Sequence, residues 1–188
     1  MLNDKDIRTA LLLMIEKENN KHNYRVINEM VVCDGQARVD IAVANGRLCG
    51  YEIKSDIDTL ERLPNQISSY NKTFDKITIV VGKKYANDII STVPEHWGIK
   101  MAYMNRFKNI SFQSIRAPKI NNEVESNSLL ELLWRDEIYL FLKEYGLKGL
   151  SKKNVGELRD IACNTIPLKD IRSYTLKVLK TRQNWRAD

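Results

Sequence analysis

Two carboxylates and one lysine are the residues of this 188-residue chain best suited to hydrolytic chemistry. Asp40 lies on one strand of a predicted hairpin, and Glu52 and Lys54 lie on the next strand. The chain has only two histidines and three scattered cysteines, with no C-x-x-C pair, so zinc fingers, His-rich metal sites and paired-histidine chemistry are hard to build. Any hydrolytic chemistry must therefore depend on carboxylates and lysine.

The register of the hairpin decides whether these three side chains share one face of the sheet. Glu52 and Lys54 share a face because they are two residues apart. A two-residue loop at Asn45-Gly46 would turn Asp40 to the opposite face and would mix polar with apolar side chains. A three-residue loop puts Asp40 on the face of Glu52 and Lys54 and leaves an apolar opposite face, made of Val39, Ile41, Val43, Cys49, Tyr51 and Ile53. We predict the three-residue loop, in which Gly46 can adopt the left-handed conformation, and this register also builds a metal site.

The elements around the hairpin predict an α/β fold. A helix that Asn3 or Asp4 can cap comes first, and three β-rich runs follow at 24–32, 37–44 and 47–54. A helix with Pro64 near its first turn, a buried strand at 76–81, a short helix at 85–91 and a short strand at 98–103 come next. The predicted order is α-β-β-β-α-β-α-β.

The C-terminal part of the chain has a different character. Residues 117–128 are polar and read as a linker, so we divide the chain into a core at 1–116, this linker, and a helical subdomain at 129–188. Within the subdomain we expect one helix from 129 to about 146, one capped by Ser151 and ending near 162, and one that opens at Pro167.

Composition excludes several classes of protein. Apolar residues make up 43% and charged residues 29% of the chain, which are proportions of a globular protein. No apolar run approaches the roughly 20 residues of a membrane helix, and the N-terminus has no signal-peptide core, so we expect a cytoplasmic protein without a membrane partner. The net charge is +6, and the C-terminal helical part is the more basic, which permits contact with phosphates.

The hairpin and its surroundings resemble the PD-(D/E)XK nuclease superfamily, which has the restriction-endonuclease-like fold. The resemblance rests on Asp40 followed by Glu52-x-Lys54, on the αβββαβ order, and on Gln66 and Tyr70, which match the Q-x-x-x-Y motif of the RecB-like branch. It covers roughly residues 1–105, and the wider sequence is similar to a poorly characterised bacterial and phage family of that superfamily. One departure is that Val39, rather than proline, precedes Asp40.

The resemblance implies a Mg²⁺-dependent deoxyribonuclease, in which Mn²⁺ can substitute and the products carry a 5′-phosphate and a 3′-hydroxyl. Asp40, Glu52 and the main-chain carbonyl of Ile53 would supply hard oxygen ligands. Lys54 would hold or deprotonate the attacking water, and the motif residues Gln66 and Tyr70 would support the site. A fourth carboxylate is expected; we choose Glu29, with Glu16 and Glu18 as alternatives.

Candidate DNA contacts lie mainly outside the hairpin. The segment beginning at Gly149 resembles the first helix of a SAP-type DNA-binding hairpin. Its cations Lys152, Lys153 and Arg159 are candidate contacts to the DNA backbone, and so is Arg62. The alternatives are a catalytically silent nucleic-acid- or partner-binding module on the same fold, or an RNA-directed nuclease. Cleavage of both strands would require a homodimer or a protein partner.

Overall fold

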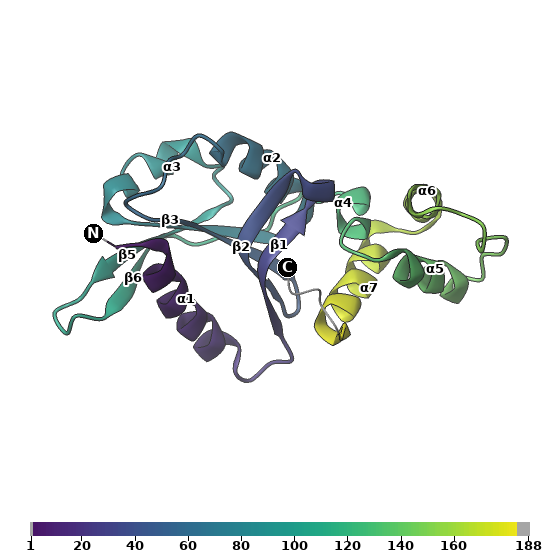
Figure 1. The fold of residues 1–188 in the computed structure, drawn as a ribbon, viewed down its shortest axis with the longest axis horizontal. Coiled ribbons are helices and arrows are strands. Elements are labelled where there is room, and N and C mark those ends of the chain that lie inside the picture. The colour runs from purple at the N-terminus through teal and green to yellow at the C-terminus, as the bar shows by residue number, and fades with distance from the viewer. Residues whose placement is uncertain (1, 184–188) are drawn as a thin grey trace.

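The computed structural model describes residues 2–183 and has a six-stranded sheet at its centre, with helices on both faces and a group of helices at one end (Figure 1). The part of the chain so described contains seven α-helices and two short 3-10 helices. The α/β prediction is therefore confirmed, as is the α-β-β-β-α-β order at the start of the chain. No helix within residues 2–183 is long and apolar enough to cross a membrane.

The strands follow one another across the sheet in sequence order. Three pairs are antiparallel, whereas β3–β4 and β4–β5 are parallel because helical segments cross between them. The strands are β1 (Arg25–Val32), β2 (Ala37–Ala44), β3 (Leu48–Lys54), β4 (Lys76–Val81), β5 (Gly98–Met104) and β6 (Ile110–Arg116).

Two different helical layers cover the sheet. Helix α1 (Asp4–Asn19) is capped by Asn3, whose Oδ1 accepts a bond from the Asp6 amide, and it packs on one face against Ile41 and Val43. Helix α2 (Leu63–Thr73) and the short α3 (Ile89–Thr92) lie on the opposite side (Figure 1). Trp97 and Tyr70 stack within the core on the α2 face, at a ring-centroid distance of 6.1 Å.

Two expectations for residues 83–116 were wrong. The predicted helix at 85–91 is instead a 3-10 turn at Lys83–Tyr85 followed by the single turn of α3, which Pro94 prevents from extending. Strand β6 was missed altogether. It follows a turn in which the Asn105 side chain accepts bonds from the amides of Phe107 and Asn109, and its residues are all half-buried or exposed, as at the edge of a sheet.

The C-terminal helices begin and end differently from the prediction. The helix expected from 129 to 146 is divided into α4 (Ser126–Leu130) and α5 (Arg135–Glu144), because Glu137 Oε2 accepts a bond from the Trp134 amide and starts a second helix there. Helix α6 (Val155–Thr165) is capped by Asn154 rather than Ser151, through a reciprocal capping box with Glu157. Helix α7 (Leu168–Thr181) follows Pro167 as predicted.

The segment predicted as a linker packs against the core. The side-chain amide of Asn121 donates to the main-chain carbonyls of Asn71 and Phe74 at 2.6 and 2.8 Å, and Val124 is buried. Residues of α4–α7 belong to the same hydrophobic cluster as the α2 face of the sheet. The helical subdomain is therefore built onto the core rather than tethered to it.

Candidate active site

Three carboxylates lie at one level of three neighbouring strands. The β2–β3 loop contains three residues, as predicted, but Gly46 does not adopt the left-handed conformation expected of it. The pair Ile41–Tyr51 continues by one residue to place Asp40 opposite Glu52. The β1–β2 register places Glu29 opposite Asp40, between the pairs Asn28–Ile41 and Met30–Val39. The sheet therefore aligns the two predicted catalytic carboxylates with the predicted fourth one.

The alternation of side chains breaks at this level. Glu29 has a φ of 53°, in the left-handed region that a non-glycine residue rarely adopts. Ile41 faces α1, whereas Val39 joins the cluster on the α2 face. The prediction that Val39 shares a face with Ile41 was therefore wrong, because the paired strands β1 and β2 both change face at Glu29 and Asp40.

Glu52 is the centre of the hydrogen-bond network, and its side chain is only 3% exposed. Its Oε1 accepts a bond from the Lys54 ammonium at 2.8 Å and one from the Gln66 amide at 2.6 Å. Its Oε2 lies 2.7 Å from the Tyr70 hydroxyl. The structure thus brings three of the predicted catalytic residues, Lys54, Gln66 and Tyr70, around a fourth, the buried Glu52.

Tyr70 and Gln66 reach Glu52 from consecutive turns of α2. Burial and the nearby negative charge of Glu52 raise the pKa of Tyr70, so the hydroxyl stays protonated and can donate. The same hydroxyl lies 2.8 Å from the Arg38 carbonyl, which ties α2 to β2. Gln66 is itself buried, and its Oε1 has no hydrogen-bond partner among the described residues.

Asp40 is held from two sides. Its Oδ2 accepts a 2.6 Å bond from the Ile53 amide on the adjacent strand, and its Oδ1 accepts a 2.7 Å bond from Arg8. Burial and the negative charge of Glu52 raise the pKa of Asp40 to about 7, although the Ile53 amide and Arg8 act in the opposite direction. Asp40 therefore gains or loses its proton near neutral pH.

Arg8 on α1 is a site residue that sequence reasoning missed. Its guanidinium bonds the Asp40 carboxylate and carbonyl, pairs with Glu29 Oε1 at 2.7 Å, and pairs with Asp4 at 3.2 Å. Arg38 pairs with the other oxygen of Glu29 at 3.0 Å. The only sequence signal was the i, i+4 spacing from Asp4 to Arg8, which is common on helix surfaces.

The carboxylates border an open pocket of about 470 Å³. Its lining comes from β1, the β1–β2 turn, β2, β3 and α2, and includes Glu29, Asp40, Glu52, Arg62 and Gln66. Arg62 is exposed at the start of α2, so this predicted phosphate contact lies on the wall of the pocket. A phosphate-bearing substrate can approach the two aligned carboxylates from this side.

The donor set at this level suits a hard divalent cation. Asp40 and Glu52 offer carboxylate oxygens, and the Ile53 main chain lies directly beside Asp40. Within residues 2–183 there is no group of three or more His, Cys, Asp and Glu side chains arranged to hold a metal ion. Glu29 faces the two arginines, with Arg8 bridging it to Asp40, so its role as a fourth ligand stays a prediction.

The candidate nucleic-acid contacts on α6 and in the loop before it differ in how exposed they are and in whether they already pair with a carboxylate. Lys152 is exposed, and Lys153 pairs with Glu157 at 3.2 Å. Arg159 is only 15% exposed and pairs with Asp34 at 2.7 Å. Asp34 lies in the β1–β2 turn, a 3-10 turn (Cys33–Gly35) whose three residues all have positive φ. Arg159 therefore fastens the helical subdomain to a turn at the edge of the pocket.

Comparison with known proteins gives one family and one relative. The family model described as "Bacteriophage P4 protein cII" matches residues 1–188. The chain is 27% identical over 182 residues to "Protein cII" of Enterobacteria phage P4, an alignment that covers 97% of this chain and 68% of that protein. No solved structure matches the chain.

Proposed function

This chain belongs to the bacteriophage P4 protein cII family, and we propose that it is a metal-dependent nuclease that hydrolyses DNA phosphodiester bonds. The observation that carries the proposal is the alignment of Asp40 with Glu52 across β2 and β3, with Lys54 2.8 Å from Glu52. Two carboxylates at one level of adjacent strands repel unless a cation lies between them. A metal-dependent reaction gives that arrangement a physical reason.

The surrounding elements support the same proposal. Gln66 and Tyr70, which resemble the Q-x-x-x-Y motif, both bond Glu52 rather than lying on the helix surface. The α-β-β-β-α-β order is that of the PD-(D/E)XK superfamily that the sequence resembles. We therefore infer a restriction-endonuclease-like core, with a basic helical subdomain added to it.

Each residue has a distinct task in this reaction. Asp40, Glu52 and the Ile53 carbonyl would hold Mg²⁺ or Mn²⁺, which would polarise the phosphate and acidify a bound water. Lys54 would orient the attacking water and stabilise the developing negative charge. Gln66 and Tyr70 act through Glu52 by fixing its two oxygens, so they are positioning residues. Cleavage of both strands of a duplex would need a second copy or a protein partner.

A cleavage assay with matched variants tests the proposal. The wild type, Asp40→Asn and Glu52→Gln would be compared on single-stranded, duplex and flapped DNA and on RNA, with Mg²⁺, Mn²⁺ or EDTA. Asp136→Asn is the control, because Asp136 is a highly exposed carboxylate on α5. We expect metal-dependent cleavage of DNA that only the two site variants abolish. Cleavage by Glu52→Gln at the wild-type rate would contradict the proposal.

One observation favours a second function, a nucleic-acid-binding module without catalysis. Both oxygens of Glu52 and both oxygens of Asp40 already have hydrogen-bond partners within the protein. A site that is fully paired in this way can be purely structural. This alternative predicts DNA binding that weakens with salt, ignores Mg²⁺ and is reduced by charge reversal at Lys152 and Lys153.

A further inference from the structure

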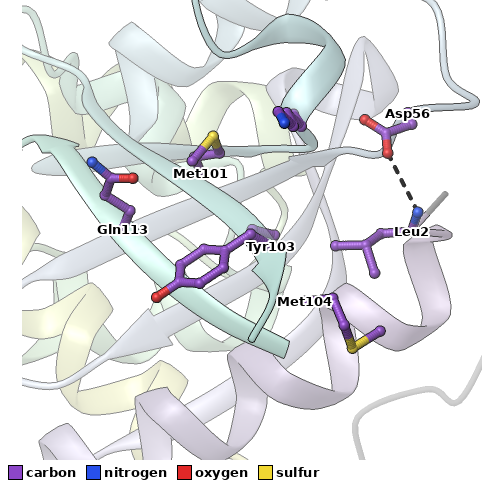
Figure 2. Close-up of a pocket in the computed structure, with 8 residues that line it drawn as sticks. Leu2, Asp56, Met101, Tyr103, Met104 and Gln113 are labelled. Atoms are coloured by element: carbon purple, nitrogen blue, oxygen red, sulfur yellow. Dashed lines mark hydrogen bonds between the residues drawn. The ribbon is translucent and has the colours of Figure 1, made fainter. Parts of the chain in front are cut away.

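A second pocket opens at the carboxyl ends of β4 and β5, outside the candidate active site. It has a volume of about 610 Å³. Figure 2 shows Met101 and Tyr103 on one strand, Gln113 on its neighbour, and Asp56 and Leu2 on the far side. The full lining is Leu2, Asp56, Lys83, Met101, Ala102, Tyr103, Met104 and Gln113.

This pocket lies at the same end of the parallel strands as Lys54. Lys54, Val81 and Met101 are paired in register across β3, β4 and β5, so they occupy one level of three adjacent strands. Two strand spacings separate Lys54 from Met101, which is roughly 10 Å. Asp56 follows Lys54 closely in the chain and lines the second pocket, so the loop after β3 joins the two sites.

The pocket and the adjoining tip of the β5–β6 hairpin combine flat or flexible apolar groups with cations. Tyr103 is 39% exposed, and Phe107 at the tip of the β5–β6 hairpin is 68% exposed, with the Arg106 guanidinium 4.6 Å from its ring centre. Lys83 lies in the wall, and Lys84 is its neighbour. A protein surface that exposes aromatic rings beside cations is typical of sites that bind unpaired nucleic acid.

The acidic residue of this pocket is turned inward to the main chain. Asp56 Oδ2 accepts a bond from the Leu2 amide at 3.3 Å, and its Oδ1 accepts one from the Lys84 amide at 3.0 Å. Its charge is therefore partly compensated by these amides. Lys83, Lys84 and the hairpin-tip cations Arg106 and Lys108 outnumber it, so the charge around the pocket favours a polyanion.

We propose that this pocket and the β5–β6 hairpin bind a single-stranded segment of the nucleic acid whose scissile phosphate lies at Asp40 and Glu52. An unpaired base stacks on the Tyr103 ring and packs against the methionine side chains, and Lys83 pairs with the backbone. The inference rests on the proposed nuclease function for the position of the scissile phosphate. It adds a substrate feature, an unpaired strand next to the cleavage point.

Binding can be measured separately from cleavage in the Asp40→Asn protein with EDTA present. Fluorescence anisotropy would follow a labelled oligothymidylate of roughly 16 nucleotides. We expect Tyr103→Ala to weaken binding roughly 5- to 150-fold and Tyr103→Phe to preserve it, because a stacked base depends on the ring and not on the hydroxyl. The control is Tyr145→Ala, which removes a ring that is 45% exposed on the helical subdomain and should leave binding unchanged. Lys83→Glu should also weaken binding relative to the Asp40→Asn protein, and it should reduce the salt dependence of binding.

The possible results separate this inference from the nuclease proposal. Unchanged binding in Tyr103→Ala, an equal loss in Tyr145→Ala, or no binding of the oligonucleotide at all would overturn the pocket assignment. Cleavage by the wild type together with unaffected binding in Tyr103→Ala would support the nuclease proposal and contradict the pocket assignment. Binding that depends on Tyr103, in a wild-type protein that never cleaves, would support the pocket assignment and contradict the nuclease proposal. Thermal melts of the Tyr103 variants establish that any loss is not unfolding.

Discussion

Replacement of Asp40 by asparagine is expected to change how protein stability depends on pH. Burial and the charge of Glu52 raise the Asp40 pKa to about 7 from an ordinary value of 3.8, against the opposing effects of the Ile53 amide and Arg8. Between these two values the folded protein keeps a proton that the unfolded chain has lost. The contribution to stability is therefore complete below about pH 4 and is lost as the pH rises through about 7.

The size of the effect follows from the shift. About three pKa units correspond to about 4 kcal/mol, and about 3 kcal/mol of this falls between roughly pH 5 and pH 8. Asparagine does not titrate, so the wild type should lose about 3 kcal/mol relative to Asp40→Asn over that range. For a chain of this size the loss corresponds to roughly 6–12 °C in melting temperature. Any change in stability that the substitution causes equally at every pH cancels in this comparison.

Thermal melts of the wild type, Asp40→Asn and the control Asp136→Asn would be recorded in EDTA across this pH range. The Asp136 variant should follow the wild type at every pH, because that side chain is exposed on α5. A constant difference between wild type and Asp40→Asn would refute the reasoning, since it would show that Arg8 and the Ile53 amide outweigh burial. At the alkaline end, Mg²⁺ should raise the melting temperature of the wild type and not that of Asp40→Asn.

Three further substitutions test the packing and charges around the site. Arg8→Met removes a cation that lowers the Asp40 pKa, so the pH at which activity reaches half its maximum should move upward in a pH–rate profile. Tyr70→Phe deletes a buried hydroxyl bonded to the site carboxylate and should cost about 1.5–3 kcal/mol in denaturant unfolding, while Tyr145→Phe at an exposed site should cost almost nothing. Gly50→Ala places a Cβ 3.0 Å from the Phe74 ring and should cost about 1–3 kcal/mol in the same assay, whereas Gly46→Ala, where a Cβ meets nothing, should not.

The hairpin register was predictable because side-chain parity and burial point to the same answer. Of the two loop lengths, only the three-residue loop puts Ile41 and Val43 on the face of Ile53 and away from Glu52 and Lys54, and a slip of one residue would reverse this arrangement. Helix boundaries near Asn3 and Pro167 were equally readable, because a cap or a proline marks each one. Local signals of this kind do not depend on tertiary contacts.

Other parts of the fold depend on contacts that a sequence pattern does not contain. Residues 117–128 look like a linker, yet Asn121 bonds two carbonyls at the end of α2 and Val124 enters the core. Arg8 was missed for the same reason, because its partners on β1 and β2 are far away in the chain. Parity also failed for Val39, because it assumes a strand that alternates without interruption.

The interruption at Glu29 and Asp40 connects the strain in the sheet with its chemistry. A left-handed φ at a non-glycine residue in the middle of a strand pair costs of order 1–2 kcal/mol, and it persists only where surrounding contacts impose it. Here the contacts are charged: Arg8 and Arg38 hold Glu29, and Arg8 also holds Asp40. If β1 and β2 alternated regularly, Val39 would face α1 and Asp40 would face α2. The break lets Asp40 bond Arg8 on the α1 side while Glu52 stays buried beneath α2. Both carboxylates therefore line one pocket without exposure of either core face.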